Sequence, residues 1–156
     1  MKRLNFSAVI TGEAVYGTVL VAGLIYAFSN YKSGAWPIFY TTLGTVVVFW
    51  IAHVYAEIVA NKVSGVGRAV GEALHRSVGL LWAMILPLGL LLLGVVGLVP
   101  DEVAVNLALW GSVVILAVLG YLAVGERSTR FWARMLGALA TGALGGALIL
   151  LKAFVH

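Results

Sequence analysis

Two ionisable side chains stand four residues apart in the apolar run "VVVFWIAHVYAEIVANK", residues 46–62. His53 and Glu57 lie on one face of a helix, one turn apart, because residues i and i+4 are neighbours on a helical surface. A third ionisable side chain, Glu13, interrupts another apolar run, "TGEAVYGTVLVAGLI". An imidazole and two carboxylates within apolar segments are candidates for a proton relay or a cation site.

A cation of similar depth follows near the C-terminus, in "RMLGALATGALGG". Helical spacing puts Arg134 on one stripe with Thr141 and Gly145, and small residues at this spacing usually form a helix contact face in membranes. We therefore expect Arg134 to point into the bundle, beside Glu13 and Glu57. In one interpretation these charges form a structural ion-pair network that fixes helix register. In the other they form a proton or cation site reached from the cytoplasm.

Glu13, His53 and Glu57 also present oxygen and nitrogen donors that suit a hard or borderline divalent metal. Three such ligands fit many arrangements, so a bound metal stays an alternative to the proton site. We predict no other cofactor. The chain has no cysteine and contains no phosphate-binding loop, serine-nucleophile motif or zinc-protease motif. An intramembrane enzyme therefore ranks behind transport and behind a structural role.

The composition identifies the solvent in which these groups must be positioned. Hydrophobic residues make up 62% of the chain and charged residues 10%. A soluble domain usually has about 45–50% apolar and about 25% charged residues. A chain of 156 residues with so few charges cannot cover its surface against water, which predicts an integral membrane protein.

Five apolar segments approach the ~20 residues needed to cross a bilayer. They predict an all-α fold, in which residues 1–156 form a single transmembrane domain, a compact bundle of five helices. The predicted spans cover about 6–28, 36–60, 77–99, 103–124 and 131–154. The connection 61–76 has apolar residues at helical spacing, which indicates either an interfacial amphipathic helix or an extension of the third span. Pro87 predicts a kink in that span.

The basic residues divide unevenly between the two sides of such a bundle. With five spans, the N-terminus and the connections 61–76 and 125–130 share one side. That side holds Lys2, Arg3, Lys62, Arg68, Arg76, Arg127, Arg130 and Arg134, whereas the other holds only Lys32 and Lys152. The positive-inside rule then places the N-terminus in the cytoplasm and the C-terminus outside. Because the basic residues serve as topology signals, we expect no nucleic-acid partner.

Other polar and small residues suggest a transport path or helix contacts. Tyr16, Thr42, Thr45 and Asn106 could line a polar path, although such side chains more often bond to neighbouring backbone. Small residues of the last span should pack it against a neighbouring helix or a second copy of the chain. This predicted packing set is Gly137, Thr141, Gly142, Gly145 and Gly146.

The stretches "FWIAHVYAEIVANK", "TGEAVYGTVLVAGLI" and "GALATGALGGALILLKAFVH" together resemble small integral membrane proteins of bacteria. The resemblance covers most of the chain and centres on the pattern AH-x-YA at residues 52–56. It implies a helical bundle in the bacterial inner (cytoplasmic) membrane. It brings no activity with it.

The leading hypothesis is a small channel or transporter for protons or cations, embedded in membrane lipids. A chain this short encloses little space, so we expect it to act as a homo-oligomer. The alternative is a non-catalytic subunit that packs against a larger membrane complex, with the Glu13, His53, Glu57 and Arg134 group as a structural ion-pair network.

Overall fold

The computed structural model describes residues 12–31, 34–60, 66–125 and 130–155, and almost all of these residues are helical. The helices are α1 (Gly12–Tyr31), α2 (Ala35–Ala60), α3 (Val66–Val95), α4 (Asp101–Gly125) and α5 (Phe131–Val155). The predicted all-α fold is confirmed for these ranges. Residues 6–11 of the first predicted span lie outside the described residues.

Four of the helices, α1 to α4, are long and apolar enough to cross a membrane, which is compatible with a small membrane protein. α5 is also long, at 25 residues. Its passage across the membrane, and therefore the count of five spans, stays a prediction.

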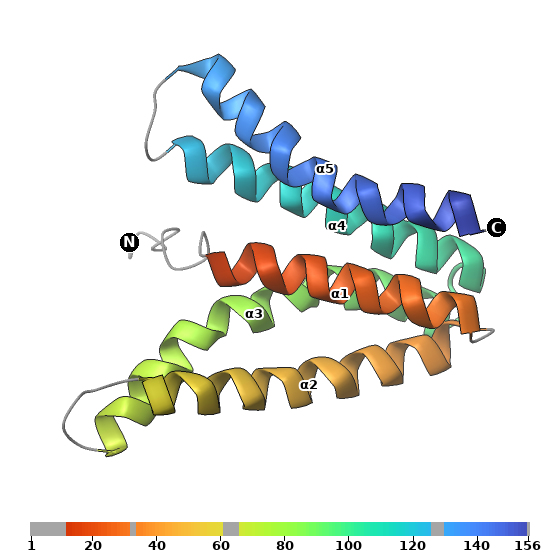
Figure 1. The fold of residues 1–156 in the computed structure, drawn as a ribbon. Helices are drawn as coiled ribbons and strands as arrows, with labels where there is room; N and C mark the ends of the chain where they lie inside the picture. The colour runs from red at the N-terminus through yellow and green to blue at the C-terminus, as the bar shows by residue number, and fades with distance from the viewer. Residues whose placement is uncertain (1–11, 32–33, 61–65, 126–129, 156) are drawn as a thin grey trace, which may run out of the picture.

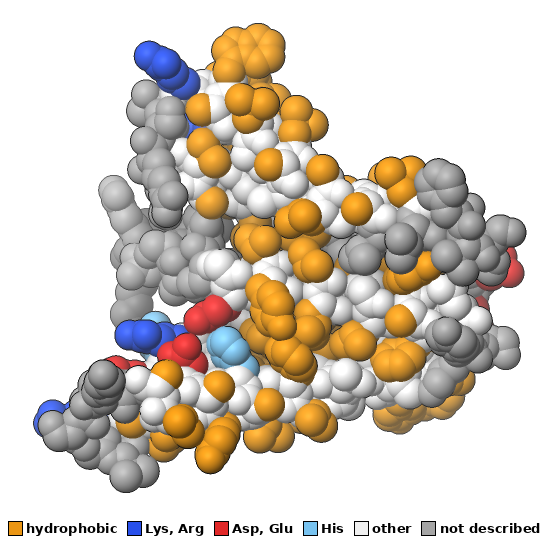
Figure 2. Space-filling view, in the orientation of Figure 1, with side chains coloured by type: hydrophobic (Ala, Val, Ile, Leu, Met, Phe, Trp, Pro, Cys, Tyr) orange, Lys and Arg blue, Asp and Glu red, His pale blue; other side chains and the backbone are white. Residues whose placement is uncertain are grey.

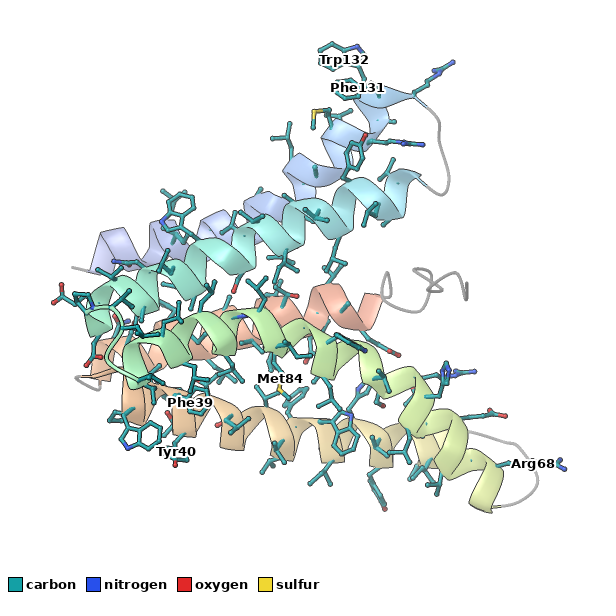
Figure 3. All side chains as sticks on the ribbon, turned by 180° about the vertical axis from the view of Figure 1, so that it is seen from behind. Phe39, Tyr40, Arg68, Met84, Phe131 and Trp132 are labelled. Carbon is teal, nitrogen blue, oxygen red and sulfur yellow. The ribbon has the colours of Figure 1, made fainter. Side chains whose placement is uncertain are left out.

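Successive helices run in opposite directions, so that the starts of α1, α3 and α5 lie at one end of the bundle (Figure 1). α1 lies beside α3 in the middle of the bundle, with α2 on one side of these two helices and the pair α4 and α5 on the other (Figures 1 and 3). It packs against all four other helices, and the most extensive contact of any two helices is between α4 and α5. The end with the starts of α1, α3 and α5 is called the inner end below, after the side that the charge pattern predicts to be cytoplasmic.

α3 shows how the segment after α2 is built. The helix begins at Val66 and continues without a break to Val95, so residues 66–76 extend the third helix and do not form a separate interfacial helix. Its 30 residues measure about 45 Å at ~1.5 Å per residue, which exceeds a hydrocarbon core of ~30 Å. Pro87 lies inside this helix and cannot donate to the carbonyl of Ala83. Figure 3 shows α3 bent along its length.

A tight turn joins α3 to α4 at the other end of the bundle. Gly97 has φ +79°, a left-handed conformation that favours glycine. The N–H of Leu98 donates to the carbonyl of Leu93 at 2.9 Å, which caps the end of α3. Close packing continues here, because a Cβ on Gly94 would lie 2.6 Å from the Cβ of Ala104.

The interior between the helices is filled mainly by aliphatic side chains. Ile25, Leu80, Leu91 and Leu116 are fully buried, and α1 and α2 add Val21 and Val46, among others. This core begins directly beyond the ionisable residues and occupies the centre of the bundle. The ionisable groups therefore border the packed interior at its inner end.

Candidate functional site

The contact between α1 and α3 fixes the level of Glu13 in the bundle. Gly17 packs so closely on α3 that a Cβ there would lie 3.0 Å from the Cβ of Ala83 and 3.2 Å from the Cα of Leu80. α1 and α3 run in the same direction (Figure 1). Glu13 is one turn before Gly17, and Arg76 and Ser77 are one turn before Leu80, so these three residues share one level.

The contact between α1 and α2 brings His53 to the same level. The rings of Tyr16 and Phe49 are 6.0 Å apart between centroids. α2 runs opposite to α1, so His53, one turn after Phe49, lies beside Glu13, about one turn before Tyr16. Glu13 accordingly interacts electrostatically with His53, Glu57 and Arg76.

These residues are here called the inner cluster: Glu13, Trp50, His53, Glu57, Arg76 and Ser77. Figure 2 shows acidic, histidine and basic side chains gathered at the inner end of the molecule, over α1, α2 and α3, with hydrophobic side chains next to them. Prediction from counting thus brought Glu13, His53 and Glu57 to one depth, and the structure places them together.

One ion pair closes the exposed edge of the inner cluster. Arg76 Nη1 lies 3.8 Å from Glu57 Oε2, with side-chain exposures of 64% and 30%. A pair this exposed contributes about 0–1 kcal/mol to stability. The pair still matters for charge, because it leaves Glu13 as the acidic side chain of the cluster without an ion pair among the described residues.

Four polar atoms of the inner cluster are buried and have no hydrogen-bond partner in the described ranges. They are Glu13 Oε2, Trp50 Nε1, His53 Nε2 and Ser77 Oγ. Ser77 is fully buried and lies on the face of α3 that carries Leu80. Leaving one such group unsatisfied costs about 1–3 kcal/mol. A site with four of them favours water or a ligand that supplies the missing bonds.

The depth of the inner cluster can be estimated from helix lengths. About 20 helical residues cross the hydrocarbon core. We count about 20 residues along each helix, starting from the end that lies opposite the inner cluster. This count places the inner boundary of the hydrocarbon core near Gly12 in α1, Val54 in α2 and Arg76 in α3. The Glu57–Arg76 pair therefore lies at this boundary, and Glu13 and His53 lie at it or just within it. Charges there cost less than the roughly 2.5–3.5 kcal/mol of a charge at mid-bilayer.

The structure places Arg134 elsewhere. Its Nη2 donates to the carbonyl of Gly125 at 3.3 Å, and its guanidinium lies 5.8 Å from the ring centroid of Tyr121. Both neighbours belong to α4, which lies with α5 on the other side of α1 from α2 (Figure 1). The cation among the electrostatic neighbours of Glu13 is Arg76. It was expected only as a topology signal in a loop or at the start of a span.

The arrangement gives no support to a bound metal. Among the described residues, no three His, Asp or Glu side chains come close enough together to hold a metal ion. The Glu13, His53 and Glu57 group is instead a set of polar groups distributed over two helices, with Arg76 facing it from a third.

The predicted path residues differ in their burial and in their hydrogen bonds. Thr42 is buried, and its Oγ1 has no hydrogen-bond partner in the described residues. Thr45 donates to the carbonyl of Thr41 at 2.7 Å and borders an open surface depression with Phe28 and Tyr40. Tyr16 is half exposed, and Asn106 is exposed on α4.

The small residues of α5 bring it against α4. Thr141 Oγ1 donates across the interface to the carbonyl of Leu116 at 2.7 Å. A Cβ on Gly137 would lie 2.7 Å from the carbonyl oxygen of Gly120, and one on Gly145 would lie 3.2 Å from the Cα of Val113. Gly142 is in ordinary contact with Ala117, and a Cβ on Gly146 would meet nothing within 4 Å.

Sequence reasoning missed Arg76 and Ser77 as members of the site. Both precede the apolar part of the third span, where a basic residue reads as an interfacial anchor. One signal was present: Ala69, Ala73, Ser77 and Leu80 recur at helical spacing and are all buried. A serine on a stripe of small and apolar residues indicates a buried helix face.

Comparison of the chain with protein-family models, with curated proteins and with solved structures finds no match. The resemblance to small bacterial membrane proteins therefore stays a prediction. The function must be argued from the geometry of the inner cluster.

Proposed function

We propose that this protein is a small membrane transporter or channel for protons or monovalent cations, with Glu13 as the group that binds the transported ion. The observation that carries the proposal is a pair of buried atoms on facing helices, Glu13 Oε2 and His53 Nε2, which have no hydrogen-bond partner among the described residues. A carboxyl and an imidazole can each take up and release a proton, and together they can pass one along.

The remaining members of the inner cluster have supporting roles in this proposal. Arg76 neutralises Glu57, so that the cluster carries one negative charge when His53 is neutral. Glu13 is then the group that changes charge when an ion binds. The cluster lies at the inner end, which the charge pattern predicts to be cytoplasmic.

The route from the inner cluster to the opposite side is proposed to run between copies of the chain. Within one copy, the interior beyond Glu13 is filled by aliphatic side chains such as Val21, Val46 and Leu80. Such a core offers no bonds to a proton or hydrated ion. α2 supports the proposal, because it is the least buried of the four apolar helices and carries Thr41 and Thr45 on an open depression.

The test is proton flux into liposomes that contain the purified protein and a trapped pH-sensitive dye, driven by a potassium gradient and valinomycin. Wild type should acidify the lumen faster than empty liposomes, and Glu13→Gln should reduce the rate at least about tenfold, because the variant cannot ionise. Glu102→Gln is the matched control, since Glu102 is an exposed acid at the other end of the bundle. Equal flux in wild type, Glu13→Gln and empty liposomes would reject transport through Glu13.

The second candidate is a non-catalytic subunit in which the inner cluster fixes helix register. The exposed Glu57–Arg76 pair and the shallow depth of the cluster favour it, because neither requires a transported ion. If flux is absent and Glu13→Gln lowers thermal stability, this candidate replaces transport.

A further inference from the structure

We propose that the inner cluster binds an organic cation with an apolar or aromatic group, and that this cation displaces a proton from Glu13. The inference deepens the proposed function, on which it rests, by naming the class of substrate. It stands on the charge of the cluster, on the aromatic rings around Glu13 and on the position of the site at the surface of the bundle.

The charge of the inner cluster suits a single positive charge. Glu57 and Arg76 form an ion pair, which leaves Glu13 as the acidic side chain of the inner cluster without an ion pair in the part of the chain that the structure describes. A monovalent cation neutralises the negative charge of this side chain, and a proton does the same. A divalent ion would need further oxygen ligands, and no described group of three His, Asp or Glu side chains provides them.

The surroundings of Glu13 are aromatic. Tyr16 is on the same face of α1, one turn further, and its ring packs on Phe49 of α2 with 6.0 Å between centroids. Trp50 is the residue after Phe49 in α2, and its Nε1 is buried and has no hydrogen-bond partner in the described ranges. Aromatic faces attract organic cations, whereas Na⁺ and K⁺ prefer several oxygen ligands. The indole N–H and the ring of Tyr16 offer no such ligand set.

A second observation points to a ligand independently of the acidic residues. Ser77 is fully buried, with 0% of its surface accessible. Its Oγ has no hydrogen-bond partner in the described residues. It is one turn before Leu80, which packs on α1 one turn beyond Glu13. A bound molecule with a polar atom would satisfy this hydroxyl together with His53 Nε2.

The inner cluster borders the outer surface of the bundle at Tyr16. Tyr16 is 49% exposed although it adjoins Glu13 on the helix. Figure 2 shows the acidic and histidine side chains on the molecular surface, beside hydrophobic side chains. A cation with an apolar group concentrates at this boundary between water and hydrocarbon, and it reaches the cluster without crossing the packed core.

Exchange follows because Glu13 is the carboxylate of the inner cluster that has no ion pair among the described residues. The protonated carboxyl of Glu13 releases its proton, and the carboxylate then pairs with the cation, so one proton leaves for each cation bound. The groups that face Glu13 are His53 and Glu57 on α2 and Arg76 on α3. α4 and α5 also pack on α1, and at this end their Tyr121 and Arg134 contact each other.

The experiment is calorimetric titration of the purified protein in detergent with benzyltrimethylammonium, in two buffers of different ionisation enthalpy, which counts released protons. We expect saturable binding with proton release, weakened roughly tenfold or more by Glu13→Gln, which corresponds to about 1.4 kcal/mol. Glu102→Gln should bind as wild type does. Trp50→Leu should weaken binding more than Trp50→Phe, because the latter keeps a ring.

The outcomes separate this inference from the proposed function. If benzyltrimethylammonium does not bind while proton flux depends on Glu13, the organic cation is wrong and the transport proposal stands. If K⁺ competes as strongly as benzyltrimethylammonium, the aromatic selectivity is wrong. If Glu13→Gln binds as tightly as wild type, the site is elsewhere. If the wild-type protein shows neither binding of benzyltrimethylammonium nor proton flux, both proposals are wrong.

Discussion

Replacing Gly120 with alanine should force α4 and α5 apart. A Cβ at this position would collide with Thr141 Oγ1 and with the carbonyl oxygen of Gly137, and would lie 2.9 Å from the carbonyl carbon of Gly137. Two of these atoms belong to the backbone of α5 and cannot rotate away. The same displacement would break the hydrogen bond from Thr141 to the carbonyl of Leu116.

The expected magnitude follows from three contributions. Overpacking costs about 1–3 kcal/mol. The interhelical hydrogen bond, measured in membranes, adds about 0.6 kcal/mol. Alanine returns about 0.5–1 kcal/mol, because it loses less backbone freedom than glycine in a helix. The free energy of unfolding of Gly120→Ala should therefore fall by roughly 1–3 kcal/mol.

The assay is equilibrium unfolding of the purified protein in mixed micelles, titrated with dodecyl sulfate and followed by circular dichroism. Gly146→Ala is the matched control on α5, because its Cβ would meet nothing within 4 Å. It should leave stability unchanged or raise it by at most about 0.5–1 kcal/mol. If the Gly120 and Gly146 variants unfold at the same midpoint, the close contact of α4 and α5 is not present in the folded protein.

Three further predictions concern the other contacts of the bundle. A double-mutant cycle on Glu57→Gln and Arg76→Gln should give a coupling below about 1 kcal/mol in unfolding titrations, because the pair is exposed; a larger coupling would mean that it is desolvated. Gly94→Ala should destabilise by roughly 1–3 kcal/mol in the same titration, since its Cβ would meet alanine Cβ atoms of α4 and α2 at 2.6 and 2.9 Å. The chain has no cysteine, so an impermeant maleimide should label Glu102→Cys but not Arg68→Cys on intact bacterial cells; the reverse pattern would invert the predicted orientation.

Depth along the membrane could be predicted from the sequence because it depends on counting. Glu13, His53 and Glu57 are each a few residues from the inner ends of apolar runs, and consecutive antiparallel helices place such ends together. The prediction survives errors of a few residues in the helix boundaries. The structure accordingly brings these three residues together at the inner end.

The lateral position of a residue could not be predicted in this way. Arg134 has a depth similar to that of Glu13, yet its described contacts are with Tyr121 and Gly125 of α4. Arg76 became the partner of Glu57 because α3 continues as a helix from Val66 and packs along α2. Counting along the chain could not decide which of two arginines at equal depth faces the acidic residues.

From the amino-acid sequence alone, one can predict that the chain is apolar enough for a membrane, that it forms long helices, and that a few ionisable residues stand at the inner ends of these helices. The sequence does not predict which helices are neighbours in the bundle, and this is seen first in the folded structure. α1, α2 and α4 each carry apolar residues on nearly all sides of the helix. No single hydrophobic face therefore indicates which helix packs against it. In lipid, an aliphatic side chain is solvated equally well by a neighbouring helix or by an acyl chain. Close contacts at glycines such as Gly17 and Gly120, which depend on shape, therefore select the neighbours.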